Sequence, residues 1–555
     1  MSNDTEGRLE RMSGMLKRRG FILPAFEIHG GSKGLYDFGP NGGRLRNRVN
    51  QMWLEHWTSM GNIVEISSPT ITPYEVLEAS GHVGEFSDFM TCCEDCLEVS
   101  RADTLLEEFH SNPDSLSKAE LQSLLNKSSP KCPACSSSKW SAITTQNLMF
   151  NTTIGAGDSG RKGFLRPETA QGMFTSFTSL YRHFREKLPF GAVQIGKGYR
   201  NEISPRQGMI RLREFNMAEL EYFIDPNVGI EHDLSAWDGI LFSLVSEDFG
   251  DVRVSIPEAV EKGIIRHATV GYFMAKTYDF LKNVGIDTEC LRFRQHESNE
   301  MAHYATDCWD AEIHGSYGWV ECVGIAHRGC YDLEAHEKYT GKSLRARREY
   351  SAPKEIEIDG WTVDGSVAGP AFRNLAGLVK NYVETLPAES KFPIEAEVQG
   401  NNLTIESKHV KRIQRTETVT GEWFIPHVVE PAFGIDRIIW HILDHSYNEL
   451  EKQGENYTVM KISENVVPID YCVLPLFEKE GMGEMAKEIN HYLNSKIGIA
   501  SSYDSSGSIG RRYARADEIG VPICITVDHQ SLQDRTVTLR YRDSGKQDRV
   551  SIDTL

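Results

Sequence analysis

The segment Ile195–Glu219 constrains the fold of this chain more than any other stretch. It predicts two β-strands that fold back on each other, because the residues between them favour a tight turn. Ser204 and Pro205 initiate turns, and Gly208 accepts backbone conformations that other residues avoid. The segment therefore predicts a β-hairpin.

Charged and aromatic side chains are expected to share faces of this hairpin. Side chains alternate between the two faces of a strand, so Arg200 and Glu202 fall on one face of the first arm. On the returning arm Arg211, Phe215 and Glu219 follow at intervals of four residues, roughly 13 Å apart. Such a row could hold a phosphate chain, a purine and an ammonium group. An amphipathic hairpin with a solvated charged face is the alternative.

The hairpin resembles motif 2 of class II aminoacyl-tRNA synthetases, in the form found in glycyl-tRNA synthetases of the archaeal and eukaryotic type. The sequences Arg-Pro-Glu-Thr-Ala-Gln-Gly at 166–172 and Gly-Ser-Ile-Gly-Arg-Arg-Tyr at 507–513 resemble the same family. An amphipathic helix from Pro40 followed by a strand over Ile63–Ile71 resembles motif 1. A strand over Trp423–Glu430 followed by a helix resembles motif 3. The resemblance covers roughly residues 8 to 552.

The composition is that of an ordinary soluble globular protein. The chain has 555 residues, 40% hydrophobic and 25% charged, which predicts two to four domains. Its formal net charge of -19 argues against a protein that coats nucleic acid through bulk positive charge. No apolar run approaches the ~20 residues that cross a bilayer. With a polar N-terminus, the expected compartment is the cytoplasm and no membrane partner is expected.

The resemblance implies a mixed α+β and α/β multidomain fold. Its core is the antiparallel sheet of a class II synthetase flanked by helices, with a small zinc-binding insertion and a C-terminal α/β anticodon-binding domain. The expected boundaries are 1–90 for the catalytic domain with motif 1, 91–149 for the zinc insertion, 150–349 for the catalytic domain with motif 2, 350–420 for a second insertion, 421–464 for motif 3 and 465–555 for the anticodon-binding domain.

Two cysteine pairs predict a structural zinc site. Cys93 with Cys96 and Cys132 with Cys135 offer four thiolates from two knuckles, the soft tetrahedral ligand set that zinc prefers. Cys92 adjoins the first knuckle and is an alternative to Cys93, with poorer spacing to Cys96. Free buried thiols or a labile disulfide remain alternatives to a metal.

The resemblance implies roles for individual residues in glycine activation. The catalytic residues it implies are Arg200, Glu202, Arg211 and Arg437. Those implied for glycine binding are Arg101, Glu168, Phe215, Asn216, Glu219, Glu430, Ala432 and Gly434. Those implied for ATP binding are Arg200, Asn201, Glu202, Ile210, Arg211, Phe215, Glu321, Cys322, Arg328, Gly434 and Arg437. ATP is a substrate in this reaction, and Mg²⁺ accompanies it.

Three carboxylates, Glu168, Glu219 and Glu430, are expected around one ammonium group. Glycine has no side chain, so its binding energy must come from its two charged ends. Larger amino acids are refused by sterics, and no editing domain is expected. Two positions depart from relatives: His327 stands where eukaryotic relatives usually have Asp, and Ala432 stands where family members often have Ser.

RNA contacts are expected in two places. Arg511, Arg512 and Arg515 lie on one helical turn of the region that resembles an anticodon-binding domain, with a solvated helix as the alternative. Within 350–420 a second basic group is a candidate contact for the acceptor end of tRNA, with a solvated face as its alternative. That group is Lys408, Lys411, Arg412 and Arg415. The expected partners are glycine, ATP, glycine tRNA and a second copy of the chain in a homodimer.

The implied function is activation of glycine as glycyl adenylate and transfer of glycine to the terminal ribose of glycine tRNA. One alternative is a catalytically inactive, synthetase-like accessory protein that binds nucleic acid. Retention of Arg200, Arg211, Arg437 and the three glutamates speaks against it. A weaker alternative is an adenylating ligase for another small amino acid. Exchange assays with glycine, alanine and serine distinguish these readings.

Overall fold

The structure is a computed structural model that describes residues 3–110, 112–113, 116–203, 205, 208–230, 232–297, 307–398, 401–452 and 455–555. The chain divides into two compact units. The first consists of Met1–Leu344 with Pro426–Leu555, and the second of Arg345–Ile425. Within the described ranges, no helix combines the length and apolar character needed to cross a membrane.

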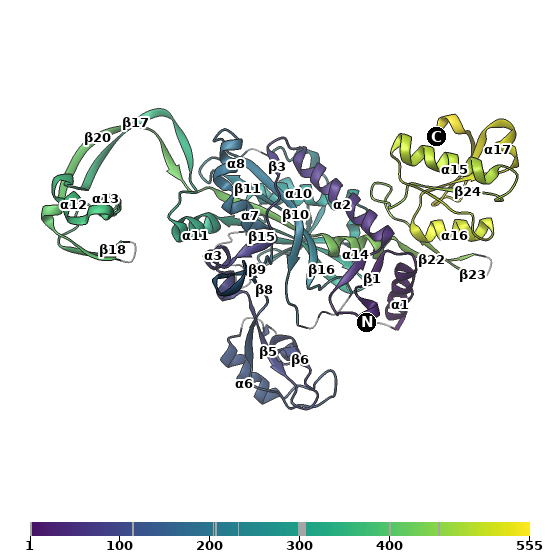
Figure 1. Ribbon diagram of the computed structural model, residues 1–555, viewed down its shortest axis with the longest axis horizontal. Coiled ribbons are helices and arrows are strands. Elements are labelled where there is room, and N and C mark those ends of the chain that lie inside the picture. The colour runs from purple at the N-terminus through teal and green to yellow at the C-terminus, as the bar shows by residue number, and fades with distance from the viewer. Residues whose placement is uncertain are drawn as a thin grey trace. The chain divides into compact units, whose positions relative to one another are not determined.

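A nine-stranded sheet forms the centre of the first unit (Figure 1), in the order β13-β12-β14-β15-β16-β21-β11-β10-β3. The prediction of an antiparallel sheet holds for its central strands, but β12 pairs with β14, and β10 with β3, in parallel. The nine strands are β3 (Ile63–Glu65), β10 (Phe190–Tyr199), β11 (Glu214–Ile224), β12 (Phe242–Ser246), β13 (Gly250–Val254), β14 (Leu291–Gln295), β15 (Asp307–Gly315), β16 (Gly318–Gly329) and β21 (His427–Gly434).

Helix α2 (Pro40–Thr58) shows why one face of this sheet is buried. Pro40 occupies the first turn, where its missing N–H costs no hydrogen bond. Leu45, Val49, Trp53 and Trp57 recur every four residues, and all four are fully buried. The rings of Trp53 and Trp57 lie 5.6 and 5.9 Å from the ring of Phe433 on β21. Since strand residues alternate, the neighbours of Phe433 are directed to the opposite face.

The remaining helices of this part of the chain are short or pack around the sheet. They are α1 (Asn3–Arg18), α3 (Tyr74–Ala79), α4 (His82–Glu85), α5 (Ala102–Leu106), α6 (Lys118–Ser128), α7 (Ala170–Thr175), α8 (Phe177–His183), α9 (Ile256–Glu261), α10 (Ala268–Asn283), α11 (Tyr331–Thr340) and α14 (Ile435–Ser446). Helix α14 is buried along almost its whole length, which agrees with its run of isoleucines.

Prolines move two of the predicted strands. The strand predicted over Ile63–Ile71 is split into β3 and β4 (Ile71–Pro73), with Pro69 in the gap, because proline has no N–H to offer a sheet ladder. The strand predicted over Trp423–Glu430 is likewise interrupted before Pro426. The preceding strand ends at Phe424, and β21 begins at His427.

Small sheets complete the first unit. They are β1-β2, β4-β9-β8, β6-β5-β7 and β22-β23. Their strands are β1 (Ile22–Pro24), β2 (Tyr36–Phe38), β5 (Ser87–Cys92), β6 (Val99–Arg101), β7 (Thr144–Asn147), β8 (Asn151–Ile154), β9 (Arg161–Leu165), β22 (Tyr447–Lys452) and β23 (Glu455–Met460).

The C-terminal segment is an α/β layer structure around a five-stranded sheet of order β25-β24-β26-β27-β28. Helices α15 and α16 lie on opposite faces of β24 (Figure 1), each over its own hydrophobic cluster. The elements are β24 (Tyr471–Pro475), α15 (Met482–Tyr492), β25 (Ser501–Tyr503), α16 (Ile509–Ile519), β26 (Ile523–Val527), α17 (His529–Asp534), β27 (Thr536–Tyr541) and β28 (Gln547–Ser551). The β-α pattern predicted after Glu464 is present.

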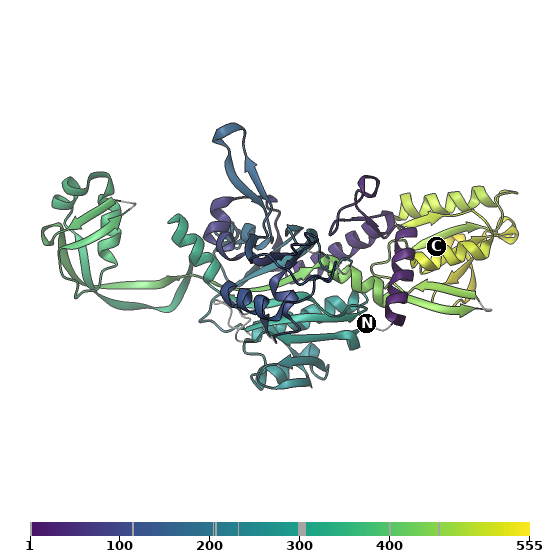
Figure 2. The same cartoon turned by 90° about the horizontal axis from the view of Figure 1, so that it is seen from below.

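The second unit is a long two-stranded ribbon that leads into a small α/β globule (Figure 2). The ribbon pairs β17 (Ala346–Val363) with β20 (Val410–Phe424) in antiparallel register. The globule contains α12 (Gly365–Phe372), α13 (Ala376–Glu384), β18 (Ile394–Val398) and β19 (Asn401–Ile405). It has a hydrophobic cluster of its own, which includes Val379, Val383 and Ile405.

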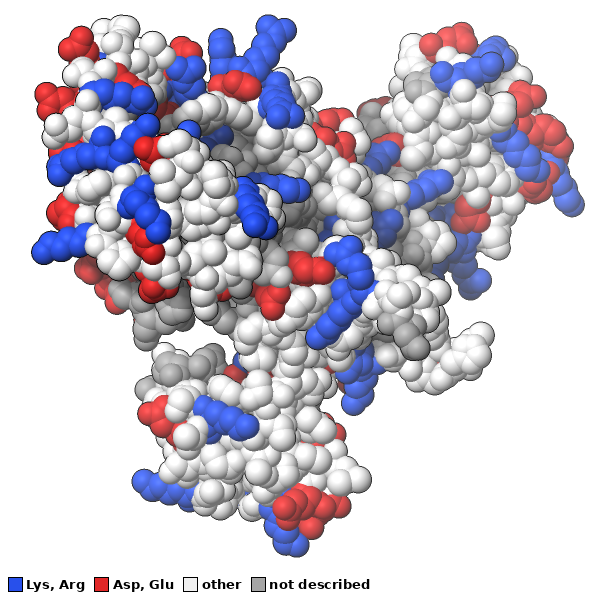
Figure 3. Space-filling model, turned by 60° about the vertical axis from the view of Figure 1, so that its left-hand side comes forward, with Lys and Arg blue, Asp and Glu red and all other residues white. Residues whose placement is uncertain are grey.

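The surface carries charges of both signs. On the face drawn in Figure 3, Lys and Arg side chains are interspersed with Asp and Glu side chains. This agrees with the composition, in which acidic residues exceed basic residues without forming long runs.

Candidate active site

Strands β10 and β11 form the hairpin that the sequence predicted, and its ladder ends where Tyr199 lies opposite Glu214. Arg200, Glu202 and Arg211 were expected on the strands, but they lie in the connection between them. The backbone N–H of Arg200 still donates to the carbonyl of residue 213, at 2.9 Å. The arms of the hairpin therefore splay into a loop at the point where its charged residues begin.

The composition of the connection explains why the ladder stops. Pro205 cannot donate a backbone hydrogen bond, and Gly208 has a φ of 60°, which favours glycine. Ser204, Arg206 and Gln207 lie outside the described residues.

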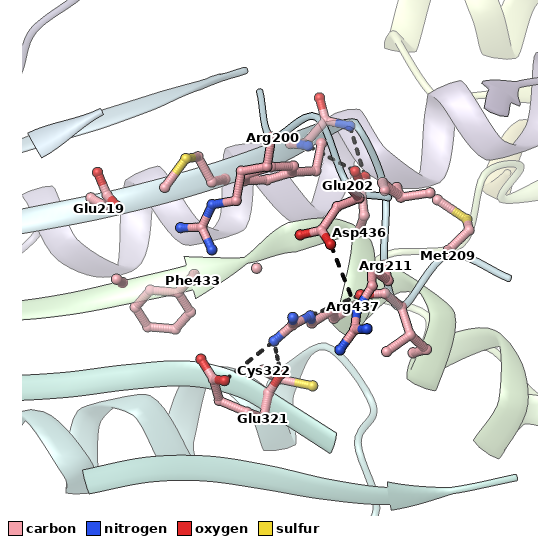
Figure 4. A pocket seen from close by; sticks show the side chains of 17 residues that line it. Arg200, Glu202, Met209, Arg211, Glu219, Glu321, Cys322, Phe433, Asp436 and Arg437 are labelled. Atoms are coloured by element: carbon pink, nitrogen blue, oxygen red, sulfur yellow. Dashed lines mark hydrogen bonds and ion pairs between the residues drawn. The ribbon is translucent and has the colours of Figure 1, made fainter. Parts of the chain in front are cut away.

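A cavity of about 180 Å³ opens between this connection, strands β16 and β21 and the start of α14. Most of the predicted catalytic and nucleotide-binding residues line it (Figure 4). The predicted residues that line the cavity are Arg200, Glu202, Ile210, Arg211, Phe215, Asn216, Glu219, Glu321, Cys322, Ala432, Gly434 and Arg437. One surface thus collects residues that are more than 200 positions apart in the sequence.

Arg437, in the first turn of α14, is fixed by the backbone. Its Nε donates to the carbonyl of Ile210 at 3.1 Å, and its Nη1 donates to the carbonyl of Glu321 at 2.6 Å. Arg211 faces it in the cavity, with its Nε 4.0 Å from the carboxylate of Glu202. Two guanidinium groups near a helix N-terminus make this end of the cavity attractive to phosphate.

Arg200 supplies a third guanidinium group. It lies over two aromatic rings, 5.2 Å from the ring centre of Phe86 and 5.4 Å from that of Phe215. Its Nε is buried, and no described residue accepts a hydrogen bond from it. A buried donor without a protein partner points to a ligand acceptor in the cavity.

Glu219 lies at the other end of the cavity, where it is held by Thr169. One oxygen of Glu219 accepts the backbone N–H of Thr169 at 2.8 Å and also its hydroxyl. Glu430 accepts a hydrogen bond from Nη1 of Arg328 at 2.7 Å. Arg328 also forms a bidentate ion pair with Asp332, with N–O distances of 2.9 and 3.1 Å. Arg328 is thus shared between Glu430 and Asp332, so one guanidinium group neutralises these two carboxylates only in part.

Glu168 completes the acidic group from the segment before α7. Its carboxylate lies 3.2 Å from Nε2 of His82 and accepts Nε2 of Gln171 at 2.9 Å. Burial opposes ionisation of Glu168, but the charges of His82 and Arg328 outweigh it and hold the pKa of this carboxyl below its usual range. Burial also favours a neutral imidazole, yet Glu168 raises the pKa of His82.

Burial is the largest effect on the pKa values of the other two carboxyl groups, Glu219 and Glu430. It raises the pKa of Glu219 to about 8, assisted by the charges of Glu430 and Glu168. It also raises the pKa of Glu430, against the effect of Arg328. The acidic group thus combines an ionised carboxylate, Glu168, with a carboxyl that binds a proton near neutral pH, Glu219. A bound cation would stabilise the ionised form of both.

Asn216 is positioned by a residue that sequence reasoning missed. Its backbone N–H and its side-chain amide each donate to the carboxylate of Asp436 at 2.7 Å. Burial raises the pKa of Asp436 to about 6. Asp436 is adjacent to Arg437, so its place within motif 3 was the sequence feature that could have pointed to it.

Four further residues in or beside the acidic group were not predicted from the sequence: His82, Gln171, Glu221 and Asp332. His82 opens the short helix α4 and Asp332 lies in the first turn of α11, beyond the predicted strand, so neither spacing nor composition linked them to the site. Glu221 is two residues after Glu219 on the same strand, and alternation along the strand could have found it.

Five residues predicted to bind glycine or ATP do not line the main cavity: Glu168, which lines a neighbouring cavity, and Glu430, Arg328, Arg101 and Asn201. Arg328, expected at the nucleotide end, instead contacts Glu430 and Asp332. Arg101 pairs with Asp103, and it lines a neighbouring cavity that also reaches Glu202 and Arg211. Asn201 donates its backbone N–H to the carbonyl of Leu148 at 2.7 Å.

His327, where the sequence departs from relatives, belongs to a group of histidines. Its ring stacks on His267, with centroids 4.4 Å apart, and its Nε2 lies 3.3 Å from Nδ1 of His427. Burial lowers the pKa of His327 to about 4, with smaller effects from both neighbours.

The arginines of α16 separate into buried and exposed groups. Arg512 was expected to face RNA, but it is only 4% exposed and donates to the carbonyls of Pro475 and Gly507. Arg515 forms a hydrogen-bonded ion pair with Asp504. Arg511 is exposed. A buried guanidinium group cannot contact RNA, so the first of these predictions is corrected to a structural role.

The predicted basic group of the second unit is largely paired with carboxylates. Arg412 forms a bidentate pair with Asp359 at 2.8 Å, and Arg415 pairs with Glu417. Lys408 pairs with Glu406 at 2.5 Å. Exposed ion pairs of this kind contribute little to stability.

The four predicted zinc ligands converge. The sulfur atoms of Cys93, Cys96, Cys132 and Cys135 all lie within 4.8 Å of one another. The two knuckles share a backbone pattern, because residues 97 and 136 both have a φ of 62° and donate to the first cysteine of their pair. Cys92 instead directs its sulfur to the carbonyl of Cys93.

Comparison with known families gives two matches. The family described as "Anticodon binding domain" matches residues 470–555. The family described as "tRNA synthetase class II core domain (G, H, P, S and T)" matches residues 153–243, which contain the β10–β11 hairpin.

Curated relatives match almost the whole chain. A glycine–tRNA ligase of Methanocaldococcus jannaschii is 44% identical over 571 residues, covering 98% of this chain and 97% of the relative. One of Archaeoglobus fulgidus is 44% identical over 542 residues, covering 98% and 94%. Among solved structures, a Giardia lamblia prolyl-tRNA synthetase in complex with prolyl-adenylate has a TM-score of 0.52 at 12% identity, covering 99% of this chain and 74% of that one. That likeness concerns the fold.

Proposed function

The chain belongs to the glycine–tRNA ligase family, and from this membership we propose that the cavity of Figure 4 is where it activates glycine with ATP. The enzyme is an aminoacyl-tRNA synthetase of class II. The observation that carries the assignment of the site is that Arg200, Arg211, Arg437 and Glu219 line one cavity.

The reaction has two steps. A carboxylate oxygen of glycine attacks the α-phosphorus of ATP, and pyrophosphate leaves as glycyl adenylate forms. A hydroxyl of the terminal ribose of glycine tRNA then attacks the carbonyl carbon, and AMP leaves. Neither step requires a covalent bond to the protein, so catalysis rests on positioning and on neutralising charge.

We assign the nucleotide to the end of the cavity that carries the guanidinium groups. Arg200 would contact the α-phosphate and the glycine carboxylate, and its buried, unpartnered Nε supports this role. Arg211 and Arg437 would hold the outer phosphates. Phe215 would stack on the adenine, with Glu202 near its edge.

We assign the ammonium group of glycine to Glu219, Glu168 and Glu430. The support is their convergence from three separate elements and the incomplete neutralisation of their charges by Arg328 and His82. Thr169 holds Glu219 through two hydrogen bonds, which fixes where the ammonium would sit.

We propose that the cysteine cluster binds a structural zinc ion. Four sulfur atoms within 4.8 Å on two matching knuckles fit the tetrahedral preference of zinc, and they leave no open position for catalysis. Mg²⁺ would arrive with ATP, with Glu321 as a carboxylate in reach of the phosphates. It would neutralise the charge of the phosphates.

We further propose that the C-terminal segment contacts the anticodon and that two copies of the chain form a homodimer. The match of residues 470–555 and the exposure of Arg511 support the RNA contact. The motif 1 helix and strand support the dimer through the resemblance described above. The alternative of an inactive accessory protein is not favoured, because the relatives are ligases and the cavity retains its arginines.

Replacing Arg200 tests the assignment of the cavity. We expect Arg200→Ala to reduce glycine-dependent ATP–pyrophosphate exchange by at least roughly 10²–10³-fold, since it removes a preorganised charge at the reacting phosphate. Arg253→Ala is the matched control, because Arg253 is exposed and forms an ion pair with Glu289 on the surface. Exchange at the wild-type rate in Arg200→Ala would overturn the assignment.

A further inference from the structure

Glu221 is a buried carboxyl group beside the proposed ammonium site. It lies on β11 two residues after Glu219, so both side chains are on the same face of the strand. The register that pairs Glu219 with Ala432 and Tyr222 with Val429 sets Glu221 opposite Glu430. One carboxyl oxygen from each of Glu219, Glu221 and Glu430 lies within 4.8 Å of the other two.

The surroundings of Glu221 do not support a negative charge. Its exposed fraction is 0%, and neither oxygen has a hydrogen-bond partner among the described residues. Leaving an ionised carboxylate in such a place costs far more than protonating it. Burial first, and then the charge of Glu430, raises the pKa of Glu221 well above its usual value.

Titratable and charged groups from several elements surround the Glu219–Glu221 pair and its neighbours Glu168, Glu430 and Asp332. They are Glu168 and Arg166 before α7, His82 on α4, Cys308 on β15, Arg328 on β16, Asp332 and His336 on α11, Glu430 on β21 and Arg200 after β10. Four glutamates and an aspartate thus meet three arginines and His82, while burial lowers the pKa of the second histidine, His336. With all five ionised, the empty pocket would carry an excess of buried negative charge.

We propose that the Glu219–Glu221 pair holds two protons when the pocket is empty and one when glycine is bound. The glycine ammonium displaces the proton of Glu219 to solvent, and Glu221 remains an uncharged acid. This inference rests on the proposed function, because it concerns the same site. No bond other than the O–H of Glu219 is broken.

The direction of the pH dependence follows from which form binds the ammonium. Only ionised Glu219 attracts it, and the pKa of Glu219 in the empty pocket is raised to about 8. Below that pH the KM for glycine should fall about tenfold for each unit by which pH rises. Above it the KM should become level. The KM for ATP, measured in parallel, should not follow this profile.

The variant Glu221→Gln tests whether Glu221 is uncharged. Glutamine is isosteric and neutral, so we expect the midpoint of the KM–pH profile to move by less than about half a unit. An ionised Glu221 within 4.8 Å of Glu219 would raise the pKa of Glu219, and with it the midpoint, by about two units. Replacing an ionised Glu221 by glutamine would therefore lower the midpoint by that amount. Glu214→Gln is the matched control, because Glu214 is the exposed first residue of β11.

Proton release is measured directly by calorimetry. A non-reactive analogue of glycyl adenylate is titrated into the full chain at pH 7 in phosphate and in Tris, whose ionisation enthalpies differ. We expect release of close to one proton per site in the wild type and in Glu221→Gln. No release, a flat KM–pH profile or a two-unit fall of the midpoint in Glu221→Gln would each overturn the inference. Absence of glycine-dependent exchange at every pH would instead overturn the proposed function.

Discussion

At the residue scale, two acidic side chains are held in states that cost stability. Burial raises the pKa of Glu219 to about 8 and that of Asp436 to about 6. A carboxyl whose folded pKa lies above its unfolded value binds its proton more tightly in the folded protein. The free energy of unfolding is then highest below the unfolded pKa, near 4, and falls as pH rises through the folded pKa.

Removing the charge of Glu219 should therefore stabilise the protein while it abolishes glycine binding. We expect Glu219→Gln to increase the free energy of unfolding by roughly 1–3 kcal/mol at pH 8 and by much less at pH 5. The glutamine oxygen can still accept both hydrogen bonds from Thr169. Denaturant titration at the two pH values measures the effect, with Glu214→Gln as the exposed control. Equal effects at both pH values would contradict the expectation.

The sequence predicted the residues of the cavity that lie within recognisable motifs. Arg200, Arg211 and Arg437 stand in such patterns, and all three line the cavity. The contacts around other site residues could not be predicted, because a pair such as Glu168 and His82 joins segments that are distant in the sequence and whose approach depends on tertiary packing. Arg512 was misplaced for a related reason: a helical turn shows which residues neighbour each other, but not which face is buried.

At the element scale, the two cysteine knuckles show local sequence and structure in agreement. Each knuckle turns through a residue with positive φ whose backbone N–H donates to the carbonyl of the first cysteine. Spacing alone predicted the pairs because the knuckle is a local structure. The split of the motif 1 strand at Pro69 was less predictable, since a β-branched run indicates extension without showing where pairing ends.

The adjacent cysteines of the first knuckle allow a matched test for zinc. We expect Cys93→Ser to lose bound zinc and to lower the melting temperature, because three sulfur ligands hold the ion less tightly than four. Cys92→Ser should retain the metal, since its sulfur lies outside the cluster. Elemental analysis of both variants by mass spectrometry measures the zinc content. Equal zinc content in the two would contradict the assignment of ligands.

At the scale of the whole molecule, the second unit is attached through a paired ribbon. Arg347 lies opposite Trp423 in the ladder of β17 and β20, so the chain leaves and returns at neighbouring positions. The globule beyond the ribbon has its own hydrophobic cluster. Folding of the nine-stranded sheet is therefore expected not to depend on it.

A deletion tests this independence and the predicted contact with tRNA. Residues 348–422 are replaced by Asn-Gly, a sequence that closes two-residue hairpins. We expect glycine-dependent exchange to stay within about threefold of wild type, while the KM for tRNA in charging rises. Neutralising Lys408, Lys411, Arg412 and Arg415 together is the companion variant. An unchanged KM for tRNA in both would remove the proposed acceptor contact, and loss of exchange in a soluble deletion variant would contradict the independence of the unit.

Because the first and last strands of this unit pair with each other, its attachment has a consequence for how the protein can evolve. A segment whose two ends already touch can be lengthened, exchanged or lost in a single genetic event without altering the path of the chain on either side. Evolution can then vary the domain inserted at this position while the residues of the proposed active site stay the same.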